Sequence, residues 1–349
     1  MVTIHEVARD AGVSPSTVSY AISGKRRISD TTRHRVEESM RRLGYVPKPL
    51  LTTGRPVGPG QRRKDIALFA PTRPGVDLAI IMGFIDCISR WARSLGYHTL
   101  LFTEDDDGRA LQQVSAQRLA DAIIVMDVEG ADPRAPLLRH RPHPAVLIGL
   151  PDDPGELHCV DFNFSLAGAR AAEYLAGLGR RHVGFIGSPA SVYQRGTKFA
   201  QSLLAGLQHA AGLHQLTVAW SPCELDADDP RERVEALLQR MPEMSGLVVH
   251  NEAALSRVLL ELERRNLRIP RDVSVVAVLP DDAARSFDER IATVRIPVSD
   301  ISRAAVRMVT AQVGGPAAPE IRLLSPRPIG EVAVIPGPGH RKPAVRPDR

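Results

Sequence analysis

Two short amphipathic segments joined by a tight turn occupy residues 3–24, and no other feature constrains the fold of the chain as strongly. Thr3 and Glu6 have the spacing of a capping box, in which two residues satisfy free amides at the start of a helix. After a glycine-containing turn, Ser14 and Pro15 favour a second helix start, because proline at the first helical position loses no hydrogen bond. The arrangement predicts a helix-turn-helix, whose second helix contacts the major groove of DNA.

A third helix completes this N-terminal unit, beginning after Ser29 and ending at Gly44. Apolar residues at helical spacing give the three helices a shared buried face: Ile4, Val7, Ala8, Val18, Ala21, Ile22, Val36, Met40 and Leu43. Residues 1–48 are therefore predicted to form a small all-α DNA-binding domain.

Basic charge is concentrated at this end of the chain. Residues 1–64 contain 13 Lys and Arg against 5 Asp and Glu, whereas acidic residues outnumber basic ones in the remainder. Lys25, Arg26 and Arg27 follow the second helix, where they can neutralise phosphates and supply salt-sensitive affinity. Double-stranded DNA is therefore the expected partner.

A specific sequence pattern supports this interpretation. The chain has T-I-x-x-V-A-x-x-A-G-V-S-x-x-T-V-S from Thr3 to Ser19, and the match extends to residues 43–47. This pattern resembles the LacI/GalR (lactose-repressor/galactose-repressor) family of bacterial transcriptional regulators. The resemblance implies that the following residues contact DNA: Thr3, Ser14, Pro15, Ser16, Thr17, Ser19, Tyr20, Ser23, Lys25, Arg26 and Arg27.

The family's base-contacting positions correspond here to Pro15, Ser16 and Tyr20, and its backbone-contacting positions to Thr17, Ser19 and Ser23. Tyr20 stands where the family often has arginine. Tyrosine cannot make the bidentate contact of arginine with guanine, so we expect an operator that differs from the common family half-site.

The linker, residues 49–64, departs from the family pattern of a hinge helix with a leucine that wedges into the minor groove. Gly54 takes the place of that leucine when the sequences are matched without gaps. Two interpretations stay open. Leu50 or Leu51 serves as the wedge in a shifted register, or the segment is a flexible basic linker.

Residues 65–336 alternate short apolar runs with longer amphipathic ones. Strands are predicted at residues 66–70, 98–102, 122–126, 145–149, 183–187, 216–220, 246–250 and 273–279. Helices are predicted near residues 80–95, 111–119, 166–178, 198–211, 231–239 and 253–266. Such alternation predicts parallel, doubly wound α/β sheets that bind a ligand outside the carboxyl ends of their strands.

Three further segments, residues 177–187, 269–276 and 293–297, resemble the periplasmic-binding-protein-like core of the same family. The resemblance implies two lobes and three crossings between them, near residues 161–165, 292–296 and 323–328. Lobe one then comprises about 65–161 plus 296–323, and lobe two about 162–292 plus 327–336. Residues 337–349 are expected to form a disordered basic tail.

The resemblance also carries over candidate effector contacts. Asn251 corresponds to the asparagine of an N-D element, Asp281 and Asp282 to a later D-D pair, and Arg195 beside Tyr193 to a ligand-pairing arginine. Such groups make directional hydrogen bonds to vicinal hydroxyls, which predicts a sugar effector. Alternatively, the two aspartates cap the next helix.

Aromatic residues make up only 4% of the chain, so the surface for stacking a sugar is expected to be small. It would comprise Trp220, Tyr193 or Phe162. A purine, a phosphorylated metabolite or another non-sugar ligand, a protein partner, or no small molecule at all are the alternatives.

Enzyme signatures are missing from the sequence. It contains no G-x-S-x-G, Walker A or H-E-x-x-H motif, and no complete G-x-G-x-x-G after a predicted strand, so neither catalysis nor a cofactor is expected. Pro142 and Pro144 favour a loop around His140 and His143, which are interpreted as surface residues rather than metal ligands.

Three unevenly spaced cysteines indicate reduced thiols, and no apolar run has the roughly 18 residues of a membrane span. The polar, capped N-terminus argues against a secreted solute-binding protein of the same fold. The sequence thus predicts a cytoplasmic, homodimeric, effector-controlled repressor, with a tetramer as a further possibility.

Overall fold

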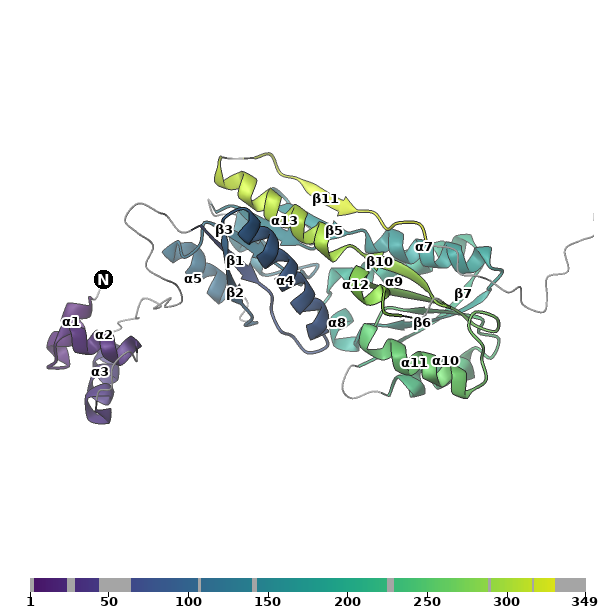
Figure 1. Ribbon diagram of the computed structural model, residues 1–349, viewed down its shortest axis with the longest axis horizontal. Coiled ribbons are helices and arrows are strands. Elements are labelled where there is room, and N and C mark those ends of the chain that lie inside the picture. Colours follow the sequence, from purple (N-terminus) through teal and green to yellow (C-terminus); the bar gives the residue numbers. More distant parts are fainter. Residues whose placement is uncertain are drawn as a thin grey trace, which may run out of the picture. The chain divides into compact units, whose positions relative to one another are not determined.

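The computed structural model describes residues 3–23, 29–43, 64–105, 108–139, 143–224, 229–287, 290–315 and 317–329. The chain divides into two compact units, residues 1–62 and residues 63–349 (Figure 1). Among the described residues, no helix combines the length and the apolar character needed to cross a membrane.

The first unit contains three helices: α1 (Ile4–Asp10), α2 (Pro15–Ser23) and α3 (Asp30–Leu43). Their core consists of buried apolar residues, and the predicted stripe is confirmed at Val7, Ala8, Val18 and Val36. Ala11, which was not predicted, is buried with them. Gly12, in the turn between α1 and α2, has a φ of +63°, a conformation that glycine adopts without strain.

A buried serine holds α3 against α1. The Ser39 hydroxyl donates to the Val7 carbonyl oxygen at 3.3 Å and to Asp10 Oδ2 at 2.5 Å, and Arg42 pairs with the same carboxylate at 2.6 Å. Because Ser39 is fully buried, these bonds satisfy a polar group that would otherwise be costly in the core.

The second unit contains two parallel sheets, which define two lobes. The first sheet has the order β11-β5-β4-β3-β1-β2. Its strands are β1 (Asp65–Phe69), β2 (His98–Phe102), β3 (Ala122–Val125), β4 (Ala145–Ile148), β5 (His158–Phe162) and β11 (Ile321–Leu324). The second sheet has the order β10-β9-β8-β6-β7. Its strands are β6 (His182–Gly187), β7 (Thr217–Pro222), β8 (Gly246–Val249), β9 (Ser274–Pro280) and β10 (Ala292–Ile296).

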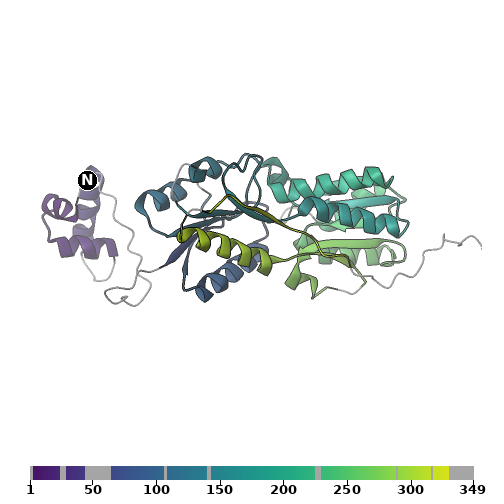
Figure 2. The ribbon, with the colours of Figure 1, turned by 90° about the horizontal axis from the view of Figure 1, so that it is seen from above.

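Helices cover both sheets (Figures 1 and 2). The first lobe carries α4 (Leu78–Ser94), α5 (Arg109–Gln117), α6 (Arg134–Arg139) and α13 (Val298–Val313). The second carries α7 (Phe164–Gly177), α8 (Ala190–Gln194), α9 (Lys198–Leu213), α10 (Pro230–Arg240), α11 (Glu252–Arg264) and α12 (Asp281–Ala284). The predicted α/β architecture of this region is confirmed.

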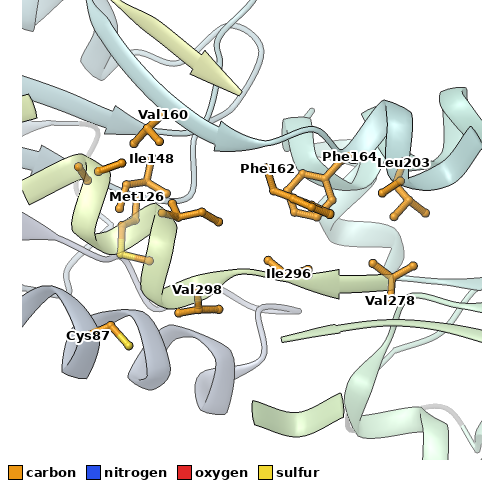
Figure 3. Packing of buried hydrophobic residues seen from close by; sticks show 14 of the residues in the cluster. Cys87, Met126, Ile148, Val160, Phe162, Phe164, Leu203, Val278, Ile296 and Val298 are labelled. Atoms are coloured by element: carbon orange, nitrogen blue, oxygen red, sulfur yellow. The ribbon is translucent and has the colours of Figure 1, made fainter. Parts of the chain in front are cut away.

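The chain passes between the lobes at Asn163, between β5 and α7, and at Pro297, between β10 and α13. One apolar cluster continues through these passages. In Figure 3, Phe162 and Phe164 lie between Val160 of the first sheet and Leu203 of α9 in the second lobe. The lobes therefore share part of their core.

Helices α7 and α9 approach closely because glycines face each other's backbone. A Cβ on Gly206 would meet the Ser165 carbonyl oxygen at 1.9 Å, and one on Gly168 would meet that of Leu203 at 2.2 Å. This close packing fixes the starts of α7 and α9, which both contribute to the site described below.

Candidate functional site

The start of α2 is built by local hydrogen bonds. The Thr17 amide donates to Ser14 Oγ at 3.1 Å, so Ser14 caps the helix as predicted. In α1, the Thr3 amide donates to Glu6 Oε2 at 2.7 Å and the Glu6 amide donates to Thr3 Oγ1 at 3.4 Å. These bonds confirm the capping box. The hydrogen bonds that the Thr3 amide and the Thr3 hydroxyl donate to the Glu6 carboxylate lower the pKa of Glu6.

The face of α2 opposite its buried Val18 is accessible. Pro15 and Ser16 are exposed, and Thr17 and Tyr20 are partly exposed. Small hydroxyls and one phenol on this face can contact phosphates and base edges. The remaining predicted DNA contacts are side chains or segments that lie outside the described part of the structure: Ser19, Ser23, Lys25, Arg26, Arg27, Leu50 and Leu51.

A cavity of about 140 Å³ lies between the two lobes, beside the carboxyl ends of several strands of both sheets. Apolar side chains from both lobes dominate its lining: Val76, Ile80, Ile81, Phe84, Met126, Val128, Ile148, Phe164, Phe199, Val278, Ile296 and Ile301. Its polar lining residues are Asp77, Asp127, Asp161, Ser188, Lys198, His250, Asn251 and Glu252.

Three aromatic rings form one wall of the cavity. The ring centroids of Phe164 and Phe199 are 5.7 Å apart, and that of His250 lies 5.9 Å from the first and 5.7 Å from the second. Such distances are typical of favourable aromatic pairs. Phe164 begins α7, Phe199 belongs to the first turn of α9, and His250 follows β8, so three separate elements create this wall.

His250 is a buried polar group with unused hydrogen-bonding capacity. Its Nδ1 atom has no partner among the described residues, and the residue is 8% exposed. Burial lowers the pKa of His250 to about 4, so the ring is neutral near pH 7. A neutral imidazole can both donate and accept a hydrogen bond.

Asp161, the next-to-last residue of β5, also lines the cavity. Its Oδ1 accepts a hydrogen bond of 2.8 Å from the Phe162 amide. Burial raises the pKa of Asp161 to about 7. Asp161 is partly exposed and borders the cavity. A ligand in the cavity can therefore reach its carboxyl group.

Asn251 is fully engaged by the protein. Its Nδ2 donates to the Cys223 carbonyl oxygen at 2.9 Å and, more weakly, to that of Gly187 at 3.4 Å, and its Oδ1 accepts from the Ala254 amide at 3.1 Å. Asn251 therefore caps α11 and ties three segments together at the edge of the cavity.

The structure does not bring the other predicted effector residues together at this cavity. Tyr193, Arg195, Trp220, Asp281 and Asp282 are not among its described lining residues. Tyr193 and Trp220 pack on each other, with ring centroids 5.3 Å apart. Phe162, the third predicted stacking residue, is 2% exposed within the core.

The two aspartates lie in the first turn of α12. Asp282 is 89% exposed and pairs with Arg285 at 3.3 Å. Asp281 borders a different, smaller cavity together with Arg295 and Arg327. The N-cap of α12 is Pro280. Asp281 and Asp282 therefore lie in the first turn of the helix but do not cap it.

Sequence reasoning missed Asp161, Phe164, Phe199 and His250 as cavity residues. The available signal was their position, because Asp161 and Phe164 lie at the predicted crossing near 161–165 and His250 ends a predicted strand. Which side chains at those positions face the cavity depends on tertiary packing.

An interlobe clasp, residues 128–130 of the first lobe and 195–198 of the second, joins the lobes beside the cavity. Glu129 and Thr197 form an antiparallel bridge. The Gly130 amide donates to the Gly196 carbonyl oxygen at 3.0 Å, and Lys198 Nζ pairs with Asp152 at 2.7 Å. Since Val128 and Lys198 also line the cavity, the clasp and the cavity are mechanically connected.

A buried arginine supports the first-lobe side of the clasp. The Arg73 side chain is 5% exposed and pairs with Asp105 and Glu129 at 2.7 Å and with Asp127 at 3.3 Å. Burial raises the pKa of Asp127 on balance, although the positive charges of Arg73, Arg195 and Arg134 oppose that rise. Removing one member would leave buried charge uncompensated.

A helix-turn-helix unit joined to a two-lobed parallel α/β unit defines a class, the DNA-binding transcriptional regulators, rather than an enzyme. Residues 3–48 match the model of the bacterial regulatory proteins, lacI family, and residues 172–330 match the periplasmic binding protein-like domain. The chain belongs to the LacI family.

Curated relatives agree with this assignment. The HTH-type transcriptional regulator GntR of Pseudomonas aeruginosa is 25% identical over 319 residues, covering 90% of each chain. The HTH-type transcriptional repressor PurR of Escherichia coli is 24% identical over 317 residues, covering 88% of this chain and 89% of the relative.

Solved structures share the fold. The lac repressor dimer bound to operator and the anti-inducer ONPF superimposes with a TM-score of 0.66 at 20% identity, covering 95% of this chain and 98% of that one. The CelR–cellobiose complex, a transcriptional regulator, gives a TM-score of 0.63 at 21% identity, covering 94% and 98%.

Proposed function

We propose that the protein is a repressor whose affinity for a palindromic operator is controlled by a small molecule bound in the interlobe cavity. The observation that carries this proposal is the cavity itself, which takes its lining from both lobes and shares Val128 and Lys198 with the clasp. A ligand in this position contacts both lobes at once, so it changes the free-energy balance between their arrangements.

For the DNA side, we propose a homodimer that presents two copies of α2 to two half-sites about 34–36 Å apart. Pro15, Ser16 and Tyr20 lie on its accessible face and are proposed to contact bases, while Thr17 contacts the backbone. The same roles are proposed for Thr3, Ser14, Ser19, Ser23 and the basic residues 25–27. We propose a cytoplasmic location, because the protein acts on DNA.

For the effector, the family resemblance favours a sugar. Two features of the cavity support this class. The ring wall of Phe164, Phe199 and His250 offers an apolar surface to the C–H face of a sugar, and Asp161 and His250 offer hydrogen bonds to hydroxyls. A coupling free energy of about 1–3 kcal/mol would change operator affinity by about 5–150-fold.

Selection of DNA sequences by the purified full-length protein tests the proposal. We expect an enriched palindrome, bound with an affinity that falls steeply with salt. Addition of the effector should then shift that affinity. A protein that enriches no sequence, with and without extracts of small metabolites, would refute the proposed function.

A further inference from the structure

The size of the interlobe cavity limits what it can hold. Its volume of about 140 Å³ is close to that of an engineered apolar cavity of about 150 Å³ that binds one benzene molecule. A single six-membered ring fits such a space, whereas a second linked ring would have to extend beyond it. The cavity therefore matches one ring, placed against the wall of Phe164, Phe199 and His250.

The lining limits how many hydroxyl groups the ring can carry. Thirteen apolar residues of the described lining, Pro189 included, surround the cavity. A hydroxyl buried against them without a partner costs roughly 1–3 kcal/mol. At least one face of the ring must therefore present C–H groups.

Few polar groups in the lining remain free to bind a ligand. Asn251 is engaged by Cys223 and Ala254, and the Lys198 ammonium group is paired with Asp152. Asp161, His250 and Glu252 differ from them, and the Glu252 carboxylate has no hydrogen-bond or ion-pair partner among the described residues. The only hydrogen bond that Asp161 accepts among those described comes from the Phe162 amide, and His250 Nδ1 has no partner among the described residues.

Charge in and around the cavity disfavours an anion. Four lining residues are acidic, namely Asp77, Asp127, Asp161 and Glu252. Burial raises the pKa of Glu252, and the charge of Asp77 raises it further, which shows that negative charge is already unfavourable there. Lys198, the one basic residue among the described lining, is neutralised by Asp152.

From these observations we infer that the effector is a single-ring sugar or cyclic alcohol that carries no negative charge and has one apolar face, such as a deoxysugar, and is not an acidic, phosphorylated or two-ring sugar. Its apolar face lies against Phe164 and Phe199, and its hydroxyls bond to Asp161 and His250. This inference rests on the proposed function, because it names the ligand class of the same cavity.

Calorimetric titration of the full-length protein in the absence of DNA tests the inference. The probes are the 6-deoxyhexoses L-rhamnose and L-fucose, with D-glucose, D-gluconate, D-glucose 6-phosphate, cyclohexylamine and cellobiose for comparison. We expect at least one 6-deoxyhexose to bind ten-fold or more tightly than each charged or two-ring probe. Tightest binding of gluconate, the phosphate, the amine or cellobiose would overturn the inference, as would no binding of any single-ring alcohol.

Matched variants locate the binding site. Phe199→Leu should weaken binding of the preferred deoxyhexose about ten-fold or more, whereas Phe102→Leu, in a stacked pair with Phe69 in the first lobe, should leave it unchanged. If both variants changed ligand affinity equally, the placement of the ligand against Phe199 would be overturned. Operator binding is measured separately on the same proteins. If a single-ring ligand binds but no operator is enriched, only the proposed repressor function is refuted. If an operator is enriched but no single-ring ligand binds, only the proposed ligand class is refuted.

Discussion

Arg195 of the second lobe donates a hydrogen bond of 2.9 Å from its Nη1 to the carbonyl oxygen of Pro74 in the first. Arg195 thus binds the protein's own backbone at the position where the family resemblance suggested a ligand hydroxyl. Its Nε also lies 4.0 Å from Glu129 of the clasp. The side chain therefore fastens the lobes to each other.

Arg195→Gln should loosen the clasp. Losing a charged hydrogen bond at a partly buried site costs about 1–2 kcal/mol, which predicts roughly 5–30-fold faster hydrogen exchange at the Gly130 and Lys198 amides. Arg170→Gln, which breaks an exposed pair with Glu173, is the control and should leave both amides unchanged. Equal exchange rates in the wild type and Arg195→Gln would show that the clasp is held by other contacts.

Gly75→Ala should force the lobes apart locally. Gly75 has a φ of +81°, and a Cβ there would lie 2.5 Å from Ser191 Oγ and 2.9 Å from Pro189 Cβ. We expect a loss of about 1–3 kcal/mol in the free energy of unfolding. Gly83→Ala is the matched control in α4. It has open space and should gain about 0.5–1 kcal/mol, and urea titrations of both variants compare the two sites.

The buried carboxyl group of Asp161 should make stability fall as the pH rises. Its pKa of about 7 lies above the ordinary 3.8, so the folded protein keeps a proton that the unfolded chain has lost. Its contribution is complete below about pH 4 and is lost as the pH rises towards 7, at about 1.4 kcal/mol per pH unit. Relative to wild type, Asp161→Asn should therefore become more stable between pH 4 and 7.

His250 should produce the opposite slope. Its pKa of about 4 lies below the ordinary 6.5, so its contribution is complete above about pH 6.5 and is lost as the pH falls towards 4. The two residues oppose each other between about pH 4 and 6.5. Unfolding free energies of Asp161→Asn and His250→Asn across this range should diverge in opposite directions from that of Glu173→Gln. Parallel curves for all three would exclude these pKa shifts.

Asp281→Ala distinguishes the effector site that the family resemblance implies from the site that we propose in the interlobe cavity. Because Asp281 borders another cavity, the structure predicts that ligand affinity changes less than two-fold, whereas Asp161→Ala should weaken it. Calorimetry with the preferred ligand provides the measurement. A large loss in Asp281→Ala, in a protein that still folds and binds DNA, would support the assignment based on the family resemblance.

Much of the fold could be predicted from sequence periodicity. The eight predicted strands all occur within about two residues of their expected positions. Strands β5, β10 and β11 and helices α6, α8 and α13 were not predicted. Strand β11 is a four-residue edge strand with mostly exposed residues, and β5 contains His158 and Asp161, so neither shows a clear apolar pattern. Both depend on pairing with distant partners.

The site was less predictable than the fold for a related reason. Periodicity places residues such as His250 and Asn251 at the end of a strand, where parallel sheets bind ligands. It does not reveal that Asn251 uses its amide to cap α11 or that His250 Nδ1 stays without a partner among the described residues. Those facts depend on the loops that reach the cavity from other elements.

Tyr20→Arg tests how the accessible face of α2 selects DNA. Tyr20 is partly exposed on the face opposite Val18, and arginine there can make the bidentate contact with guanine that tyrosine cannot. We expect a change in preference of about 1–3 kcal/mol at one base pair of each half-site, detected as a new enriched operator. Arg26→Ala is the comparison, and it should lower affinity evenly across sequences and reduce the salt dependence. If Tyr20→Arg lowered affinity evenly as well, Tyr20 would be a backbone contact, and the base-contacting role would belong to its neighbours on α2.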